Sequence, residues 1–347
     1  MSVAVSVLAN AGRLHARSPL TIAVPAFLAL LGLLPLACAK HATRPEPSEQ
    51  SCCIDPPVGD HGMADDSPAW SPDGSSIAFH RAIASNYGPA GVYILSLRTR
   101  TVRLVTPGTY FSPRDLSFSP EGERLVGVWG GQLAIIDVAT GAVSRPYYTE
   151  SGVWCPNWSP DGEQILYHRA LTPSSYPLDS MGIHIFDLAT GEDHAVWAGS
   201  RLLAGWPLRW SPEGHRVAFV DDPPGDYVQG ISVYTLGDTA VQTFMATTLL
   251  IPYPWLRWYA RRRTHTDALL FTEKNGAWRQ THLIDSRTGA PLPWRYCLGP
   301  QDVPSPDGEW LAVIRAQPGD SVGVLYLREV DDFLGSKRRQ LTTYVPQ

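Results

Sequence analysis

The residues of this chain that suit acid–base chemistry are carboxylates in predicted loops. Asp221, Asp222, Asp226 and Glu273 could pair as general acid and general base, as carboxylates do in enzymes that cleave glycosidic bonds. Carboxylates in loops are more often simply solvated. We expect no nucleophile elbow of the serine-hydrolase kind, no phosphate-binding glycine loop and no zinc or EF-hand calcium motif. The sequence therefore predicts no catalytic residue, no metal site and no cofactor.

Two histidines recur in a context that could suggest a metal site. His80-Arg81 and His168-Arg169 each follow an aromatic residue at equivalent places of a repeated pattern. Metal binding would need at least a third donor, and no His-x-x-x-His spacing supplies one. We interpret both histidines as products of an internal repeat.

Binding chemistry is indicated by aromatic residues that stand with one arginine in long connecting segments. Such side chains commonly form the centre of surfaces that contact peptides or glycans. The residues that we expect to form this surface are Tyr110, Arg114, Trp154, Trp206, Tyr253, Trp255 and Tyr296. Each of them taken singly could instead fill a gap in the protein interior.

One repeated phrase determines the elements that position these residues. It occurs as Trp70-Ser71-Pro72-Asp73-Gly74 and again from Trp158 to Gly162, with near copies that begin at Phe118, Trp210 and Pro304. Ser caps a tight turn, Pro presets φ at its second position, Asp suits the third, and Gly adopts the left-handed conformation that closes a hairpin. A short apolar run of the kind used by buried strands follows each copy.

The spacing of the copies predicts a repeat architecture. With a degenerate copy at Trp258, the markers stand at positions 70, 118, 158, 210, 258 and 304, which are about 40 to 52 residues apart; the first five are aromatic and the last is Pro304. We interpret the recurring Trp as packing between the repeated units. A second turn, Asp137 to Gly141, recurs as Asp187 to Gly191 and Asp285 to Gly289.

Four strands can be placed in each repeat. In the third repeat we expect them at residues 153–158, 163–169, 182–187 and 193–197. Four antiparallel strands per unit, repeated six times, predict an all-β fold, a six-bladed β-propeller of four-stranded antiparallel blades.

These residues also carry a family resemblance. The turn phrase, the aromatic residue before it and the Asp-x-Ala-Thr-Gly hairpin resemble the WD-type repeats of TolB-like propellers, which are bacterial and mostly periplasmic. The resemblance covers about residues 64–345 and implies interaction with proteins of the cell envelope, through a peptide inserted at the mouth of the channel.

Propeller topology sorts the connections into two faces. Both kinds of short turn would lie on one face, and the long, varied loops would lie on the other. Because binding residues are usually carried by varied loops on a rigid scaffold, we expect the aromatic surface on the long-loop face.

The cysteines predict a covalent tie on that same face. An exported protein can form disulfides, and Cys155 and Cys297 each precede the first strand of a blade, while Cys52 and Cys53 lie in the segment that enters the first blade. We predict that Cys52 and Cys53 bridge to Cys155 and Cys297, with the pairing left open. The alternative is four free thiols.

Residues 1–39 have the composition of an export signal, with a basic stretch, an apolar run over residues 20–36 and small residues at the end. Three outcomes stay open. In the first, the signal is cut before Cys38 and Cys38 is lipidated, because Ala37-Cys38 resembles the signals of bacterial lipoproteins. In the second, an ordinary signal peptidase cuts the signal. In the third, the segment remains as an uncleaved membrane anchor.

The remaining chain divides into a linker and a body. Residues 40–63 are rich in Pro, Ser, Glu and His without a period, which predicts a disordered tether, and residues 64–347 form the propeller. The formal net charge of −5 argues against nucleic-acid binding.

These observations predict a monomeric, non-enzymatic module in the periplasm or at the cell surface, anchored through its N-terminus, that binds an envelope protein or peptide at the channel mouth. The alternative is a carbohydrate-active enzyme, such as a lyase or glycosidase, or a sugar-binding propeller.

Overall fold

The computed structural model describes only part of the chain, and every described residue belongs to the compact unit Glu49–Gln347. The described ranges are residues 65–81, 89–108, 116–171, 181–199, 207–221, 229–238, 240–247, 255–260, 267–275, 278–292, 302–316, 323–329 and 338–340. The predicted signal, residues 1–39, and the predicted tether, residues 40–63, lie outside them. None of the described segments forms a helix of the length and apolar character that crossing a bilayer requires.

The described strands form six four-stranded sheets, which we name blade 1 to blade 6 in chain order. Blade 1 contains β1 (Asp65–Trp70), β2 (Ser76–Arg81), β3 (Gly91–Ser96) and β4 (Thr101–Pro107). Blade 2 contains β5 (Ser117–Phe118), β6 (Arg124–Trp129), β7 (Gln132–Asp137) and β8 (Val143–Ser144). Blade 3 contains β9 (Val153–Trp158), β10 (Gln164–Ala170), β11 (Met181–Asp187) and β12 (Asp193–Gly199).

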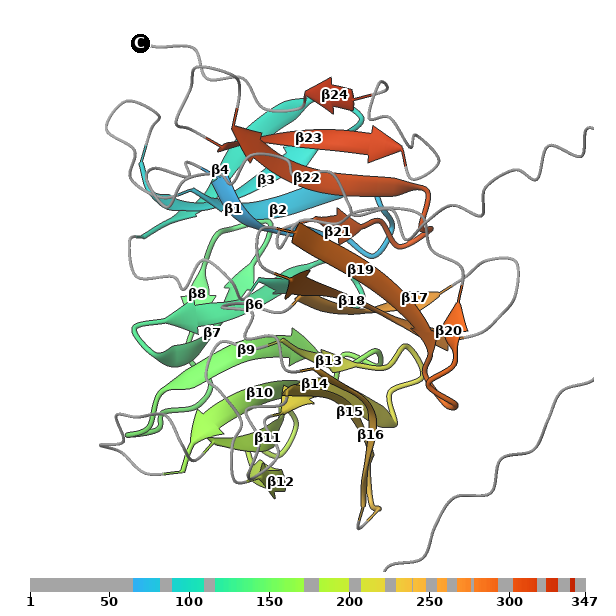
Figure 1. The fold of residues 1–347 in the computed structure, drawn as a ribbon. Helices are drawn as coiled ribbons and strands as arrows, with labels where there is room; N and C mark the ends of the chain where they lie inside the picture. Colours follow the sequence, from blue (N-terminus) through green and yellow to red (C-terminus); the bar gives the residue numbers. More distant parts are fainter. Residues whose placement is uncertain are drawn as a thin grey trace, which may run out of the picture. The chain divides into compact units, whose positions relative to one another are not determined.

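The second half of the chain repeats this plan (Figure 1). Blade 4 contains β13 (Leu208–Trp210), β14 (Arg216–Asp221), β15 (Gln229–Thr235) and β16 (Val241–Thr247). Blade 5 contains β17 (Trp255–Ala260), β18 (Asp267–Asn275), β19 (Trp278–Asp285) and β20 (Pro291–Leu292). Blade 6 contains β21 (Val303–Pro304), β22 (Trp310–Ala316), β23 (Gly323–Glu329) and β24 (Arg338–Gln340).

Within every blade, strands that follow one another in sequence are hydrogen-bonded neighbours. All of these pairs are antiparallel, as in β10 with β9 and β11. The prediction of an all-β propeller with four-stranded antiparallel blades is therefore confirmed. In blade 3 the observed strand bounds differ from the expected ones by at most two residues.

The turn phrase has the expected geometry. In its first copy, the Gly74 N–H donates to the Ser71 carbonyl at 2.9 Å, and the Ser71 hydroxyl donates to the Asp73 carboxylate at 2.6 Å. Gly74 has a φ of 69°, a left-handed conformation that glycine adopts without a steric penalty. The glycine that ends each of the other four copies has a positive φ as well, so the phrase closes the hairpin between the first and second strands of five blades.

The second recurring turn is held by an aspartate side chain. The Asp137 carboxylate accepts from the backbone N–H and the hydroxyl of Thr140, both at 2.7 Å. Asp187 and Asp285 accept in the same way from Thr190 and Thr288. These turns join the third and fourth strands of blades 2, 3 and 5.

The core consists of six apolar clusters, each between two blades. The clusters join blades 1 and 2, 2 and 3, 3 and 4, 4 and 5, 5 and 6, and finally blades 1 and 6. Alternate side chains of one strand contribute to opposite neighbours: Ile77 and Phe79 pack toward blade 6, whereas Ala78 packs toward blade 2. This division follows from the two-residue period of a strand.

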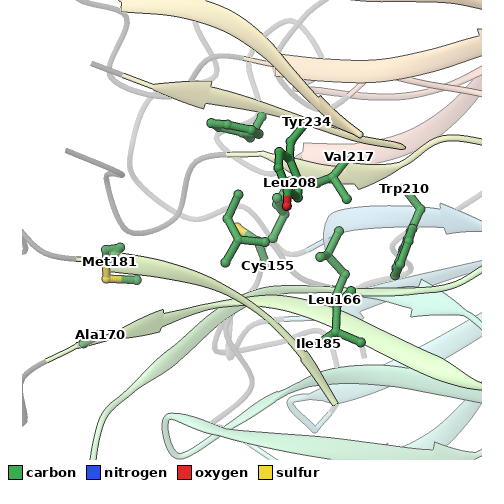
Figure 2. Packing of buried hydrophobic residues seen from close by; sticks show 11 residues of the cluster. Cys155, Leu166, Ala170, Met181, Ile185, Leu208, Trp210, Val217 and Tyr234 are labelled. Carbon is green, nitrogen blue, oxygen red and sulfur yellow. The ribbon is translucent and has the colours of Figure 1, made fainter. Parts of the chain in front are cut away.

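Figure 2 shows the cluster between blades 3 and 4, in which Leu166 and Ile185 face Leu208 and Val217. The recurring Trp residues pack at such interfaces. Trp158 and Trp210 are 5% and 6% exposed, and Trp70 and Trp258 pack against clusters at the edges of blades 1 and 5. The interpretation that these Trp residues pack between blades is confirmed.

Candidate functional site

The first strands of the blades surround a cavity of about 410 Å³, which we call the channel cavity. All six blades contribute to its wall. The lining residues are Pro68, Ala69, Trp70, Pro72, Leu116, Ser117, Phe118, Asn157, Arg209, Pro212, Arg257, Trp258, Tyr259, Val303, Pro304, Ser305, Pro306 and Gly308. Its rim includes Pro72, Pro212 and Pro306 from the turn phrases, so this cavity lies at the end of the channel that the short turns border.

One position of each repeat lines the channel cavity. The residue directly before the aromatic marker is Ala69, Ser117, Asn157, Arg209, Arg257 and Val303 in blades 1 to 6, and all six line the cavity. Successive side chains of a strand point in opposite directions, so this residue points away from the interface that the marker fills. The lining is polar on blades 2 to 5 and apolar on blades 6 and 1.

Hydrogen bonds near the channel cavity join neighbouring blades. The Asn157 side-chain amide donates to the Ser117 hydroxyl at 3.2 Å, and its carbonyl oxygen accepts from the backbone N–H of Trp210 at 3.2 Å. Asn157 thereby connects blades 2, 3 and 4.

Two tryptophan indoles make a second kind of bond between blades. The Trp258 indole donates to the Arg209 carbonyl at 3.1 Å, and the Trp70 indole donates to the Val303 carbonyl at 2.8 Å. These bonds fix the first strands of blades 5 and 4, and of blades 1 and 6, relative to one another.

Two guanidinium groups give the channel cavity its charge. Arg209 donates to the Leu208 carbonyl at 2.8 Å, and Arg257 donates to the Leu256 carbonyl at 3.3 Å. Burial lowers the pKa of Arg257 well below its ordinary value, and the charge of Arg209 lowers it further. Among the described lining residues none is Asp or Glu, so this wall is positively charged.

A buried carboxylate in blade 3 forms the second polar cluster. Asp193 accepts hydrogen bonds from the hydroxyls of Tyr147 and Tyr167 at 3.1 and 2.5 Å, from Arg169 at 2.5 Å, and from His184 Nδ1 at 3.1 Å. Burial alone would raise the pKa of Asp193, but these hydrogen bonds outweigh it and lower the pKa to about 2. A carboxylate with its oxygens occupied and such a low pKa is a structural acceptor rather than a general base.

Arg216 forms the third polar cluster, between blades 4 and 5. It contacts Glu213 and donates to Asp267 and to the Ser286 hydroxyl, both at 3.2 Å. Its guanidinium also lies 4.9 Å from the centre of the Trp258 ring. Because two carboxylates balance its charge, Arg216 joins the two blades and is not available to an anion.

Only part of the predicted aromatic surface lies in the described residues. Trp154 is half-buried and packs against the cluster between blades 3 and 4, with its ring close to Gly152. Trp255 is the first residue of β17. Tyr110, Arg114, Trp206, Tyr253 and Tyr296 lie outside the described residues, so this surface stays a prediction.

Of the five cysteines, the structure describes Cys155. Cys155 is 4% exposed within the cluster between blades 3 and 4 and has a φ of 53°. Cys38, Cys52, Cys53 and Cys297 lie outside the described residues, so lipid attachment and both disulfides stay predictions.

The expected absence of a nucleophile elbow needs a correction. Gly319-Asp320-Ser321-Val322-Gly323 does match the Gly-x-Ser-x-Gly pattern. The elbow needs a turn from a strand into a helix, whereas this sequence connects the antiparallel strands β22 and β23 of blade 6. Gly323, the last residue of the pattern, begins β23, and residues 319–322 lie outside the described residues.

The structure describes the backbone of only two of the four carboxylates considered for acid–base chemistry. Asp221 ends β14 and Glu273 lies in β18, while Asp222 and Asp226 lie outside the described residues. His80 and His168 are buried at equivalent places of β2 and β10. In the part of the chain that the structure describes, no three His, Cys, Asp or Glu residues are grouped so that they could hold a metal ion.

The residues of the channel cavity were not identified from the sequence. The signal that could have found them is the repeat alignment itself, in which the position before the aromatic marker reads Ala, Ser, Asn, Arg, Arg, Val. Two adjacent repeats have arginine at this position, whereas the other four repeats have an uncharged residue there.

Comparisons with known proteins identify the fold alone. No protein-family profile matches the chain, and no curated protein matches it. An oligogalacturonate lyase in complex with manganese has a TM-score of 0.54 at 16% identity, over 79% of this chain and 75% of the lyase. A gluconolactonase from Xanthomonas campestris has a TM-score of 0.52 at 14% identity, over 82% of this chain and 88% of that one.

TolB from Acinetobacter baumannii is also similar, with a TM-score of 0.46 at 21% identity over 65% of this chain. The chain spans about half of that protein, 55% of its length. The lyase and the gluconolactonase share the propeller architecture with this chain, and the fold leaves enzymatic activity open.

Proposed function

We propose that this chain is an exported six-bladed propeller, closed by the contact between blades 1 and 6, that binds a segment of an envelope protein at the mouth of its channel without catalysis. The export signal and the tether support a location outside the cytoplasm, in the periplasm or at the cell surface, with the N-terminus as the membrane anchor. The turn phrase and its recurrence support assignment to the TolB-like propellers with WD-type repeats.

The observation that carries the binding function is the composition of the channel cavity. Its wall combines guanidinium groups with aromatic and proline side chains, which suits recognition of a chain segment with both charged and apolar groups. Ser117 and Asn157 make hydrogen bonds to other blades. The guanidinium groups of Arg209 and Arg257 present hydrogen-bond donors and no acceptors.

A carbohydrate-active enzyme or a sugar-binding propeller is the competing function. Most glycosidases need two carboxyl groups about 5 to 10 Å apart at the substrate. The described wall of the channel cavity contains arginines and neither Asp nor Glu, which favours binding over a glycosidase.

An affinity capture from envelope extract tests the proposal. The bait is the full chain, and two variants compare the two mouths: Arg209→Gln with Arg257→Gln at the turn end, and Trp206→Ala with Tyr253→Ala and Trp255→Ala at the long-loop end. Arg98→Gln, at an exposed residue after β3, is the matched control. We expect at least one partner protein that the control retains and one of the two variants loses.

Two results would refute this function. Identical partner sets for the wild type and both variants would remove both mouths as binding surfaces. Release of an unsaturated or hydrolysed sugar from acidic polysaccharide by the wild type would establish the competing enzyme.

A further inference from the structure

We propose that Arg209 and Arg257 form an anion subsite inside the channel that takes a carboxylate group of the bound segment. The site itself stands on the geometry of the channel cavity, and its assignment to a peptide rests on the proposed function. The ligand class is a peptide carboxylate, from Asp, Glu or a C-terminus, next to an apolar side chain.

Arg209 lies on β13 and Arg257 on β17, at equivalent places of adjacent innermost strands that contact each other. The Trp258 indole, which follows Arg257 in the chain, donates to the Arg209 carbonyl. The two guanidinium groups therefore project from a backbone arrangement that is held rigid, as a preorganised site requires.

Two neighbouring arginines in this wall have an energetic cost. Burial and the neighbouring positive charge both disfavour the charged form of Arg257, and like charges repel more strongly away from bulk water. The scaffold does not need arginine here, because the equivalent residues of the other four blades are Ala69, Ser117, Asn157 and Val303.

The donors and the apolar wall of the channel cavity indicate the chemistry of the ligand. A guanidinium presents planar paired donors that match the two oxygens of a carboxylate. Blades 6 and 1 supply an apolar part of the wall with Ala69, Val303 and Pro304, and Phe118 and Trp258 also line the cavity. A cavity of about 410 Å³ is within the range of sites for small ligands, so it fits a short peptide segment and not a folded domain.

The test measures binding of defined probes to the full folded chain by calorimetry at neutral pH. The probes are the C-terminally amidated tripeptides Leu-Glu-Leu and Leu-Gln-Leu, citrate, and digalacturonate. We expect Leu-Glu-Leu to bind at least about 10-fold more tightly than Leu-Gln-Leu, since hydrogen bonds between two charged groups are stronger than those between a charged and a neutral group.

Variants assign that preference to the two arginines. Arg209→Gln and Arg257→Gln should each weaken Leu-Glu-Leu binding by about 10- to 100-fold, while Arg98→Gln leaves it unchanged. Arg257→Lys retains the charge without the paired donors and should show an intermediate loss. A thermal melt of each variant without ligand separates a loss of binding from a loss of folding.

The outcomes distinguish the subsite from the function it rests on. Binding of digalacturonate without binding of Leu-Glu-Leu, lost in both glutamine variants, would support the anion subsite and overturn its assignment to a peptide. Equal binding of every probe by the wild type and both variants would overturn the subsite. Glutamine variants that melt at lower temperature but bind normally would show that the arginines stabilise the fold instead.

Discussion

Replacement of Asp193 by Asn should destabilise the propeller in a manner that depends on pH. The change keeps the shape of the side chain but removes the charge that receives hydrogen bonds from Tyr147, Tyr167, Arg169 and His184. The Asp193 side chain is 8% exposed, so little solvent is present to replace these bonds. A buried carboxylate in such a network stabilises the folded state in its ionised form.

The magnitude follows from the pKa of Asp193. Its pKa is lowered from 3.8 to about 2 in the folded chain, and one pKa unit corresponds to about 1.4 kcal/mol, so the ionised form contributes about 2 to 3 kcal/mol of stability. Because the folded pKa is lower than the unfolded one, this contribution is complete above pH 4 and is lost as the pH falls toward 2.

Urea denaturation followed by tryptophan fluorescence measures this effect. We expect Asp193→Asn to lower the free energy of unfolding by about 2 to 3 kcal/mol at pH 7, and the difference from wild type to shrink as the pH falls below 4. Asp137→Asn, in an exposed turn, is the matched control and should show a much smaller loss. A difference that stays constant from pH 7 to the lowest pH at which the wild type is folded would refute the assignment to the charge.

Three further predictions concern the turns, the core and a buried histidine. Gly162→Ala should lower the free energy of unfolding by about 1 to 2 kcal/mol, because Gly162 has a φ of 77° and an added Cβ would lie 2.7 Å from Glu121 Oε1; a neutral result in urea titration would contradict the left-handed turn. Leu166→Ala, at a fully buried residue of the cluster between blades 3 and 4, should cost about 2 to 5 kcal/mol by the same measurement, whereas Leu171→Ala, 44% exposed, should cost little. Burial lowers the pKa of His80 from 6.5 to about 4, so the stability that neutral His80 contributes is complete above pH 6.5 and is lost as the pH falls toward 4. The urea midpoint of the wild type should therefore decline between pH 7.5 and pH 4.5, and His80→Gln should reduce this decline. An equal decline in the variant would exclude His80 as its source.

The repeat pattern predicted most of the fold because its information is local. The Ser-Pro-Asp-Gly turn depends on contacts among neighbouring residues, such as Ser71 with Asp73 and Gly74, and these form wherever the phrase occurs. The strands that follow have a two-residue period that marks their buried faces. Even the degenerate fifth copy, with Trp258 and no Pro-Asp-Gly turn, forms the same strand pair, β17 with β18.

The residues of the candidate site were harder to predict from the sequence. Attention to variable loops led to the aromatic residues, of which Trp154 packs against the protein interior. The channel lining was missed because Arg209 and Arg257 stand inside strands, where a polar residue in an alternating pattern normally faces water.

From sequence alone, the type of each turn, the approximate bounds of the strands and their grouping in fours could be determined, because these depend on residues close together in the chain. The convergence of Ser117, Asn157, Arg209 and Arg257 around one cavity was decided only by the tertiary structure, since these residues are separated by whole blades. Packing of each blade against its two neighbours brings their first strands together. That packing turns one ordinary position of a repeat into a charged channel wall.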